Sequence, residues 1–487
     1  MNSFSVVPWI ILGSSCFFAI FFQNQRPAKP KAFRGKTATQ IVCSSRAYPA
    51  APNIQKERSS QGTIRKLTSN HLTLYTDLPS TPAIDDLPQF FDLAVPEWTE
   101  YFQLPPTRLD QFHLTAYLMK DSQRFAEQKM FPKTLPDFIA GYQLGDEIWL
   151  YEQPTDYYRR HLLLHEGTHG VVKYCFGGAG PPWYSEGIAE YLATHTLTQT
   201  VSASGKVKRK ISLGQMPDSN EKFLHWGRFK MLNDSKENKG VRSLDQIFAF
   251  DSKTHYREND AYAWSWASVY FFENHPLTQK SFRKLAAKGK DRSAKFSQQF
   301  RKKHAKEWHL IQADWKVFID HLDFGYQFAP MVITHREPTT IVTTEGRAVI
   351  AADRFWQSTG LRLEGGKRYR LQASGRYQID TLPDIWWCEP GGVTLDYYRQ
   401  RPLGQLMGIL RPLSDTKILS DRSTKERRKH TDEEARTTLP PSTLFVIGTS
   451  VDITPQYDSI LYCGINEKPN QWHDNHGELQ ILVSLIE

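Results

Sequence analysis

The sequence predicts an α+β fold, with a mixed sheet followed by helices, and then an all-β sandwich at the C-terminal end. Apolar residues alternate with period two or recur at helical spacing through residues 67 to 174. Residues 182–324 are mainly helical in pattern, and short alternating runs separated by Gly and Pro begin near Pro330. A chain of 487 residues is long enough for two folded domains plus tails.

The N-terminal segment differs from the rest of the chain. Residues 4–22 form an uncharged run of 19 residues, long enough to span a bilayer. No basic residue precedes the run, no clear cleavage site follows it, and the basic residues downstream would favour a cytoplasmic orientation. We nevertheless expect export, to a secreted, periplasmic or membrane-anchored location. Residues 1–25 would be a signal peptide or membrane anchor, and residues 26–66, rich in Pro, Lys, Arg and Ser, a flexible linker.

The overall charge is mildly basic. A net charge of +9 with 23% charged and 40% hydrophobic residues is a globular composition, which excludes a disordered chain and a polytopic membrane protein. We find no arginine-rich arm, zinc finger or basic patch interleaved with aromatic residues, so a nucleic-acid partner is not expected. A solvated basic surface is favoured over an acidic partner.

The first folded domain is expected over residues 67–325. Strands are predicted at 71–78 and 112–119, helices at 84–102 and after Ser122, a hairpin at 141–151 and a helix at about 157–174. Within the later helices, 202–214 is predicted as a basic hairpin. The sandwich is expected over 330–487, with 414–441 as a mobile loop of charged and hydroxyl residues.

The cysteines exclude one class of site. Outside the first segment, the four cysteines are Cys43, Cys175, Cys388 and Cys463, and none forms a C-x-x-C pair. Cysteine zinc sites and thioredoxin-like chemistry are therefore not expected. Cys388 and Cys463 fall in the same predicted domain and could pair in an oxidising compartment.

A metal-binding pattern lies in the helix before residue 174. The segment 160–172 reads R-H-L-L-L-H-E-G-T-H-G-V-V, which places His165 and His169 on one helical face. Two such imidazoles can hold one zinc ion, and Glu166 is placed to reach a metal-bound water as the catalytic base. The alternative for this pattern alone is an amphipathic helix with two surface histidines.

A third ligand is available a short way downstream. The segment 183–191 reads W-Y-S-E-G-I-A-E-Y, and its Glu186 could complete a three-ligand catalytic zinc site. Together the two segments resemble the gluzincin branch of zincin metallopeptidases, which includes thermolysin and the membrane alanyl aminopeptidases. The resemblance covers roughly 67–325, and its specific part is 161–191. It implies a zincin-like catalytic domain with Glu186 as the third ligand and Glu190 orienting a ligand histidine.

Three neighbouring residues are weighed for roles in this site. His161 lies one turn before His165 on the ligand face, and a structural role is favoured for it over a role beside the metal. Related gluzincins supply a tyrosine or histidine from a later helix to bind the oxyanion. By that resemblance Tyr262 is the candidate, against simple packing, with Tyr256 behind it.

The chain departs from the aminopeptidases in one respect. Residues 141–151 stand where those enzymes carry G-x-M-E-N, the motif that captures a free amine, but they do not match it. An edge strand there could still pair with an extended peptide. Endopeptidase action is therefore favoured over aminopeptidase action.

The C-terminal domain carries a second resemblance. Residues 356–379 and 461–481 resemble the calcium-dependent galactose-binding lectin sandwich of bacteria. That resemblance implies a possible calcium site at Glu467, Asp474 and Asn475, although two of the family's residues are changed here. Calcium favours oxygen ligands, which these side chains supply. A polar hairpin end without metal is slightly favoured over the calcium site, and carbohydrate is a candidate partner.

The sequence thus predicts a zinc metallopeptidase, a hydrolase of peptides or proteins that uses zinc, with calcium as a candidate second metal in the sandwich. The alternative is a carbohydrate- or surface-binding protein with an inactive zincin scaffold. The intact Glu166 argues against that alternative, because a scaffold does not need the base. A zinc hydrolase of non-peptide amides stays open.

Overall fold

The computed structural model describes residues 64–201, 207–224, 226–337, 340–381, 384–413 and 443–486. The expected signal peptide or anchor, nearly all of the expected linker and the expected loop at 414–441 lie outside these residues. Among the residues described, no helix combines the length and apolar character needed to cross a membrane.

The first part of the fold is a five-stranded mixed sheet in the order β1-β2-β3-β5-β4. Its three inner strands run parallel, and both outer strands pair antiparallel with their neighbours. The strands are β1 (Arg65–Thr68), β2 (Leu72–Thr76), β3 (Leu114–Met119), β4 (Gly141–Leu144) and β5 (Glu147–Tyr151). The hairpin predicted at 141–151 is confirmed, and it leaves β4 at an edge of the sheet.

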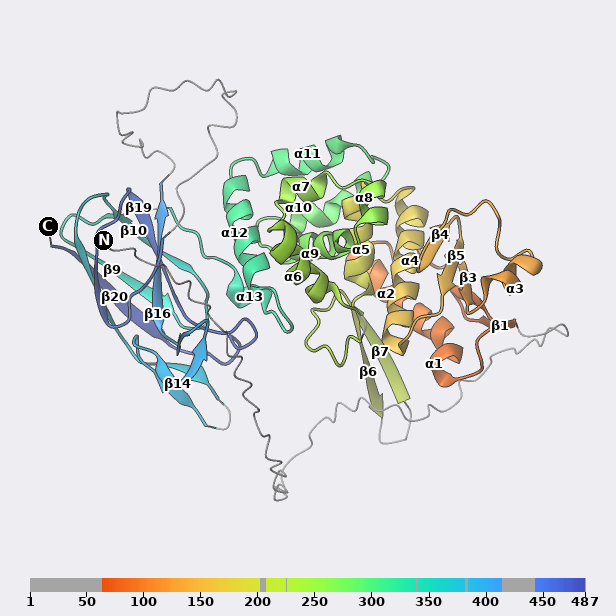
Figure 1. Ribbon diagram of the computed structural model, residues 1–487, viewed down its shortest axis with the longest axis horizontal. Helices are drawn as coiled ribbons and strands as arrows, with labels where there is room; N and C mark the ends of the chain where they lie inside the picture. Colours follow the sequence, from red (N-terminus) through yellow and green to blue (C-terminus); the bar gives the residue numbers. More distant parts are fainter. Residues whose placement is uncertain are drawn as a thin grey trace, which may run out of the picture. The chain divides into compact units, whose positions relative to one another are not determined.

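The helices of this part lie against the sheet (Figure 1). They are α1 (Pro82–Asp85), α2 (Leu87–Tyr101), α3 (Ser122–Glu127) and α4 (Asp156–Phe176). The apolar residues of α2 are buried at helical spacing, among them Phe91, Val95 and Trp98. That spacing is what predicted helix α2 from the sequence. Strand β1 was not predicted, because only one of its four residues is buried and its sequence therefore shows no alternation.

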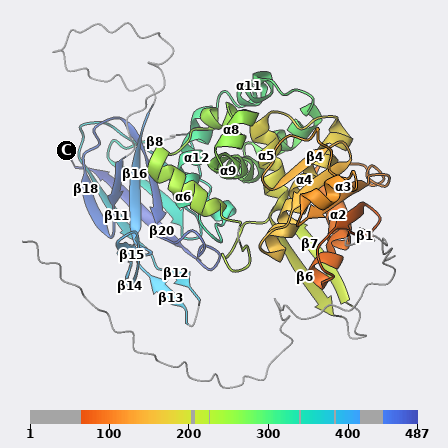
Figure 2. The same ribbon diagram turned by 45° about the vertical axis from the view of Figure 1, so that its right-hand side comes forward.

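The next part is mainly helical, as predicted. It contains α5 (Pro182–Ala193), α6 (Arg228–Lys239), α7 (Leu244–Phe248), α8 (Ser252–Arg257), α9 (Asp260–Asn274), α10 (Gln279–Arg283), η1 (Lys284–Lys288), α11 (Ala294–Lys303), α12 (Trp308–His321) and α13 (Phe328–Met331). Helix α9 is buried along nearly its whole length, and α5 packs beside it (Figure 2). The predicted hairpin starts earlier than expected, as β6 (His195–Val201) and β7 (Val207–Leu213).

The C-terminal part is all-β apart from its connections. One sheet has the order β17-β16-β19-β10-β8 and the other β18-β11-β20-β9. The strands are β8 (Thr340–Ile341), β9 (Glu345–Ala351), β10 (Gln357–Leu363), β11 (Tyr369–Ser374), β12 (Tyr377–Asp380), β13 (Trp386–Cys388), β14 (Val393–Tyr398), β15 (Arg401–Leu403), β16 (Leu406–Pro412), β17 (Thr443–Val446), β18 (Ser450–Ile453), β19 (Ser459–Ile465) and β20 (Glu478–Leu485). The α+β class and a β-rich C-terminal part are therefore confirmed.

The two cysteines of the C-terminal part are not paired. Cys388 and Cys463 are both free and both buried. Cys388 donates its S–H to the backbone carbonyl of Glu389, which satisfies the thiol without a disulfide. The pairing that the sequence left open is therefore not present in this structure.

Candidate metal centre

Helix α4 presents the two histidines of the H-E-x-x-H segment. The Thr155 side chain caps its first turn by accepting the backbone N–H of Tyr158, and Gly177 ends the helix in the left-handed region at φ +72°. These signals fix a helix of 21 residues, so His165 and His169 lie one turn apart in its middle.

The glycines within α4 allow it to lie close to its neighbours. A side chain at Gly167 would come within 2.6 Å of the Phe91 ring of α2, and one at Gly170 within 2.8 Å of Leu114 of β3. Thr168 accepts the indole N–H of Trp98 at 3.1 Å. Gly167 and Gly170 thus allow helix α4, which carries both histidines, to lie directly against α2 and the sheet.

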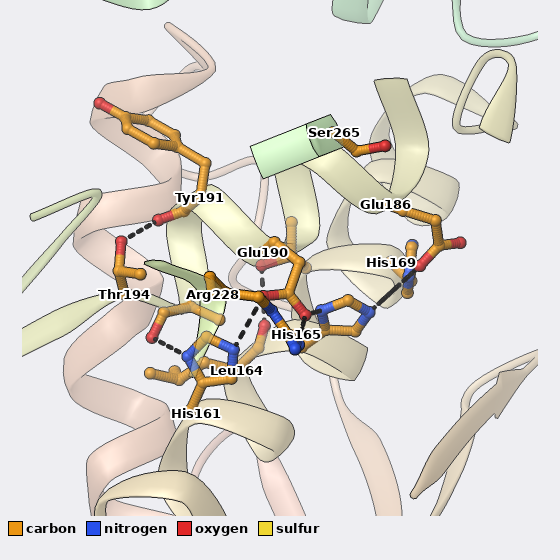
Figure 3. Close-up of polar contacts among 12 residues, drawn as sticks. His161, Leu164, His165, His169, Glu186, Glu190, Tyr191, Thr194, Arg228 and Ser265 are labelled. Atoms are coloured by element: carbon orange, nitrogen blue, oxygen red, sulfur yellow. Dashed lines mark hydrogen bonds and ion pairs between the residues drawn. The ribbon is translucent and has the colours of Figure 1, made fainter. Parts of the chain in front are cut away.

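Three side chains meet at one point. The Nε2 atoms of His165 and His169 are 3.2 Å apart, and Glu186 Oε2 lies 3.3 Å from the first and 3.5 Å from the second. Glu186 comes from α5, which packs against α4. Figure 3 shows His165 with Glu190 on one side and His169 and Glu186 on the other. The structure therefore brings together the three side chains that the sequence predicted as ligands.

The spacing of these donor atoms fits a tetrahedral metal ion. Zinc binds imidazole nitrogen and carboxylate oxygen at about 2.0–2.1 Å, so two ligands of a tetrahedral site stand about 3.3 Å apart. All three observed separations lie within 0.2 Å of that value. His165 is buried, whereas His169 and Glu186 are partly exposed, so one side of the centre is accessible to solvent.

The far nitrogens of both histidines also face polar atoms. Glu190 Oε1 lies 3.3 Å from His165 Nδ1, and the Ser185 hydroxyl lies 3.3 Å from His169 Nδ1. The Ser185 contact is a hydrogen bond, whereas Glu190 makes a close charge contact with His165 Nδ1 that lacks hydrogen-bond geometry. Polar neighbours at Nδ1 leave Nε2 of each ring to face a metal. Glu190 lies close to the His165 ring, and the orienting role that the resemblance implied for it stays a prediction.

Glu190 is itself held by a buried cation. Arg228, the first residue of α6, donates to both carboxylate oxygens of Glu190, at 2.9 and 2.7 Å. His161 Nε2 lies 3.3 Å from Glu190 Oε2, and its Nδ1 lies 3.1 Å from the carbonyl of Ala193. His161, His165 and Glu190 also form a metal-capable group, but the Arg228 guanidinium already occupies both oxygens of that carboxylate. The structural role favoured for His161 is therefore consistent with its contacts.

Glu166 lies next to the edge strand β4. A side chain at Gly141 would stand 2.6 Å from Glu166 Oε1, so only glycine leaves this carboxylate its present position. Burial raises the pKa of Glu166, while the charges of His165 and His169 oppose the shift. A carboxyl with a raised pKa is suited to accept and return a proton.

The electrostatics of the three donors are strongly coupled. Burial alone would lower the pKa of His165, but the carboxylates of Glu186 and Glu190 hold that pKa well above its usual value. Burial likewise opposes ionisation of Glu186, yet His169 and His165 lower its pKa below the ordinary range. The cluster therefore stabilises positive charge between the carboxylates.

Tyr262 lies at the same centre. Its ring centroid is 6.4 Å from that of His165 and 5.0 Å from that of His255, and the Arg228 guanidinium lies over its face at 5.8 Å. The side chain of Tyr256, the second candidate, lies outside the described residues. His255 was not anticipated: it is buried and lies 3.0 Å from the Ser265 hydroxyl.

A second cluster lies in the C-terminal part. Glu467 Oε2, Asp474 Oδ1 and Asn475 Oδ1 are buried and lack a hydrogen-bond partner. The Asn475 amide nitrogen already donates to the carbonyl of Ala352, so its oxygen is the free atom. Burial raises the pKa of Glu467 to about 8, and the nearby Asp474 charge adds to the increase.

The sequence did not reveal several residues that support the metal centre. Arg228 lies 38 positions from Glu190, and no motif connects the two. Ser185 is inside the W-Y-S-E segment, where serine alone carries no signal. Gly141 opens the predicted hairpin, and a glycine facing the base could have been suspected only once β4 had been placed beside α4.

Comparisons with known proteins add little. No family model matches the chain, and no curated protein matches it. A search of solved structures finds a domain described as "EclA N-terminal domain; PllA-like lectin", with 15% identity and a TM-score of 0.19. The match covers 30% of this chain and 98% of that chain. A likeness this low carries no argument about fold or function.

Proposed function

We propose that this protein is a zinc-dependent peptidase of the gluzincin type, with zincin-like architecture in residues 67–325. His165, His169 and Glu186 would hold the metal. The observation that carries the proposal is the mutual spacing of three donor atoms, 3.2–3.5 Å, which suits tetrahedral zinc. Two histidines and one glutamate with one open side are a donor set of catalytic zinc enzymes.

The residues around the metal have distinct tasks. A zinc ion held by these residues would supply Lewis acidity and would lower the pKa of a nearby water to about 7. Glu166 takes a proton from the attacking water and returns it to the leaving amine. Tyr262, whose ring centroid lies 6.4 Å from that of His165, would donate a hydrogen bond to the oxygen that becomes negatively charged. Glu190 and Arg228 keep the His165 ring in place.

The proposed substrate is an extended peptide or protein segment. Strand β4 pairs with β5 on one side only and ends the sheet, so its other edge offers backbone donors and acceptors. It also starts at Gly141, beside Glu166, which brings a peptide paired with β4 next to the base. The chain has no G-x-M-E-N motif, so cleavage within chains is proposed over removal of N-terminal residues.

Metal analysis together with digestion of a peptide library tests this function. We expect about one zinc per chain. His165→Ala, His169→Ala and Glu186→Ala should each lose most of the zinc and all cleavage. His309→Ala, a change at an exposed histidine of α12, should retain both. Full zinc occupancy in the Glu186→Ala protein would remove that residue from the ligand set.

A second activity is supported by the polar cluster of the C-terminal part. We propose that Glu467, Asp474 and Asn475 hold calcium, because their three free oxygens are buried without partners and calcium prefers oxygen ligands. Carbohydrate is the ligand class that such a site would serve, and this is the main alternative function if the zinc site is inactive. Calcium should raise the melting temperature of the full chain, and replacement of Asp474 and Asn475 with Ala should abolish the shift. A glycan array tests the carbohydrate step separately.

A further inference from the structure

The positive charge of the chain is concentrated in one segment. Residues 279–306 contain eight lysines, three arginines and one aspartate, a formal charge of +10 within 28 residues. The entire chain carries +9, so the other 459 residues are nearly neutral, with 50 basic and 51 acidic side chains. The charge is therefore a local feature and not an average property of the surface.

The fold separates the apolar and basic residues of this segment. It forms α10, η1 and α11, whose apolar side chains Phe282, Leu285, Phe296 and Phe300 are buried in the core. Ten of the eleven lysines and arginines are exposed, and we call these ten the basic surface. Arg283 is the exception, because it pairs with the buried Glu273. Helix α11 lies at the outer margin of the helical part (Figures 1 and 2).

Few carboxylates face the basic surface among the described residues. Asp245 pairs with Arg301 at 3.3 Å, and Asp291 accepts from the backbone and hydroxyl of Ser293. Lys288 donates to the neutral Gln299. For the remaining members, the described part of the chain shows no ion pair within 4 Å. Ten like charges within one segment of 28 residues repel one another, so a polyanion that binds this segment relieves repulsion as well as gaining attraction.

We propose that the basic surface binds the anionic headgroups of a lipid membrane. Eight of the eleven cationic residues are lysines, whose flexible stems carry point charges suited to a fluid layer of headgroups. Single-stranded nucleic acids are bound on aromatic platforms, whereas every aromatic ring of residues 279–306 is buried. Leu277, two residues before the segment, is exposed and adds one apolar side chain near its start.

The mode of binding is electrostatic attachment to the membrane surface. The apolar face of α11 is already buried, so the helix cannot insert without unfolding the core. Attachment should therefore depend on anionic lipid and weaken steeply with salt. It would place the helical part against a bilayer whether or not residues 4–22 also associate with lipid, and it does not depend on the metal centre.

Vesicle co-sedimentation of the full chain tests the proposal. Vesicles of phosphatidylcholine with about a third phosphatidylserine are compared with pure phosphatidylcholine, in low and high salt. One variant carries Lys284→Glu, Lys288→Glu and Lys290→Glu, and a second carries Lys302→Glu, Lys303→Glu and Lys306→Glu. The matched control reverses Lys133, Lys208 and Lys316, three exposed lysines elsewhere that form no ion pair within the described residues.

We expect binding to the anionic vesicles only, with loss in high salt. Each lysine near such a surface contributes about fivefold to partitioning, so each triple variant should bind at least ~100-fold more weakly. Binding of the control variant to anionic vesicles should fall far less. Binding to neutral vesicles measures any contribution of residues 4–22. Two separate variants are used so that a folding defect in one still leaves a test.

Three results would overturn the proposal. Equal binding to neutral and anionic vesicles would show that the basic surface does not select headgroup charge. An equal loss in the control would show that net charge alone is responsible. Binding of single-stranded RNA that is lost in both variants, without binding to anionic vesicles, would assign the basic surface to nucleic acid.

Discussion

At the scale of single residues, the metal centre depends on which nitrogen each histidine presents. His165 and His169 direct Nε2 to Glu186 because Nδ1 faces Glu190 in one and Ser185 in the other. The positions of the two histidines could be predicted because helical spacing places i and i+4 on one face. The residues that orient them could not, since Arg228 reaches Glu190 through tertiary packing alone.

Replacement of the proposed base separates binding from chemistry. Glu166→Gln should retain zinc, because Glu166 lies beside the donor set and is not part of it. The turnover number should fall by a factor of about 10²–10⁴, because a neutral amide cannot accept the proton. Zinc content and peptide cleavage are measured on the same preparation, with the exposed Glu127→Gln as control. Cleavage that persists would assign the base to another group.

The tyrosine at the centre is tested by removal of one hydroxyl group. Tyr262→Phe keeps the ring against His165 and His255 but removes the donor. Loss of an oxyanion donor costs about 10²–10³ in kcat, with little change in zinc content or stability. Steady-state kinetics and melting temperature are measured together. An unchanged kcat would show that Tyr262 contributes packing and does not donate to the oxyanion.

The buried cation behind the centre should control metal affinity. Arg228→Met leaves the Glu190 carboxylate buried without its bidentate partner, which costs about 3–5 kcal/mol of stability. A disturbed Glu190 no longer orients His165, so zinc affinity should fall about 10–100-fold. Competition with a chelator measures the affinity, and urea unfolding measures the stability. If Arg228→Met bound zinc as tightly as the unchanged protein, the positioning role would be refuted.

At the scale of elements, the centre is assembled by three helices that approach closely. Glycines in α4 and α5 face the neighbouring elements, and α9 runs beside α5. Alternation and helical spacing in the sequence predicted β2, β3, the hairpin at 141–151 and α4. Burial alternates regularly in β2, whereas β3 and the middle of α4 are buried on more than one face. The start of β6 was missed because most of its residues are at least partly exposed, so its burial leaves no regular pattern.

The closeness of α5 and α9 can be tested at one glycine. A side chain at Gly187 would lie 2.6 Å from the Ser265 carbonyl oxygen and 2.6 Å from Val269. Alanine normally favours a helix, but here the backbone of α9 cannot yield, so α5 must shift together with Glu186 and Glu190. We expect Gly187→Ala to cost about 1–3 kcal/mol and to weaken zinc binding.

The matched control for this change is Gly391→Ala. No atom lies within 4 Å of a side chain at that position, and its backbone is not in the left-handed region. Urea unfolding and zinc titration are compared for both variants. A Gly187→Ala protein that is as stable as the control would mean that the two helices can separate without loss.

At the scale of the whole molecule, one buried core runs through both the helical and the C-terminal parts of the described chain. The composition change near Pro330 predicted where the β-rich part begins. It could not predict the contacts across that point, because they join residues far apart in sequence. His321, the last residue of α12, packs its ring against Phe355 with centroids 5.0 Å apart. Residues 330–487 expressed alone would lose contacts of this kind.

These contacts make the stability of the chain sensitive to acid. Burial, the Arg399 charge and the Lys236 charge lower the pKa of His321 to about 4, although its bond to the Val317 carbonyl opposes them. In the unfolded chain the pKa is about 6.5. Between these values the unfolded state binds the proton and the folded state does not, so the free energy of unfolding falls as pH decreases from 6.5 towards 4.

A change at His321 isolates this contribution from that of the other histidines. His321→Asn keeps a donor for Val317 and cannot be protonated, but it loses the ring contact with Phe355, so it should be less stable than the unchanged protein at pH 7.5. That difference should shrink as pH falls to 5, because only the unchanged protein loses stability through His321. Other histidines whose pKa is lowered, including His161 and His255, act equally in both proteins and cancel. Urea unfolding at several pH values measures the difference, and a gap that stays constant from pH 7.5 to 5 would show that His321 remains accessible to protons in the folded chain.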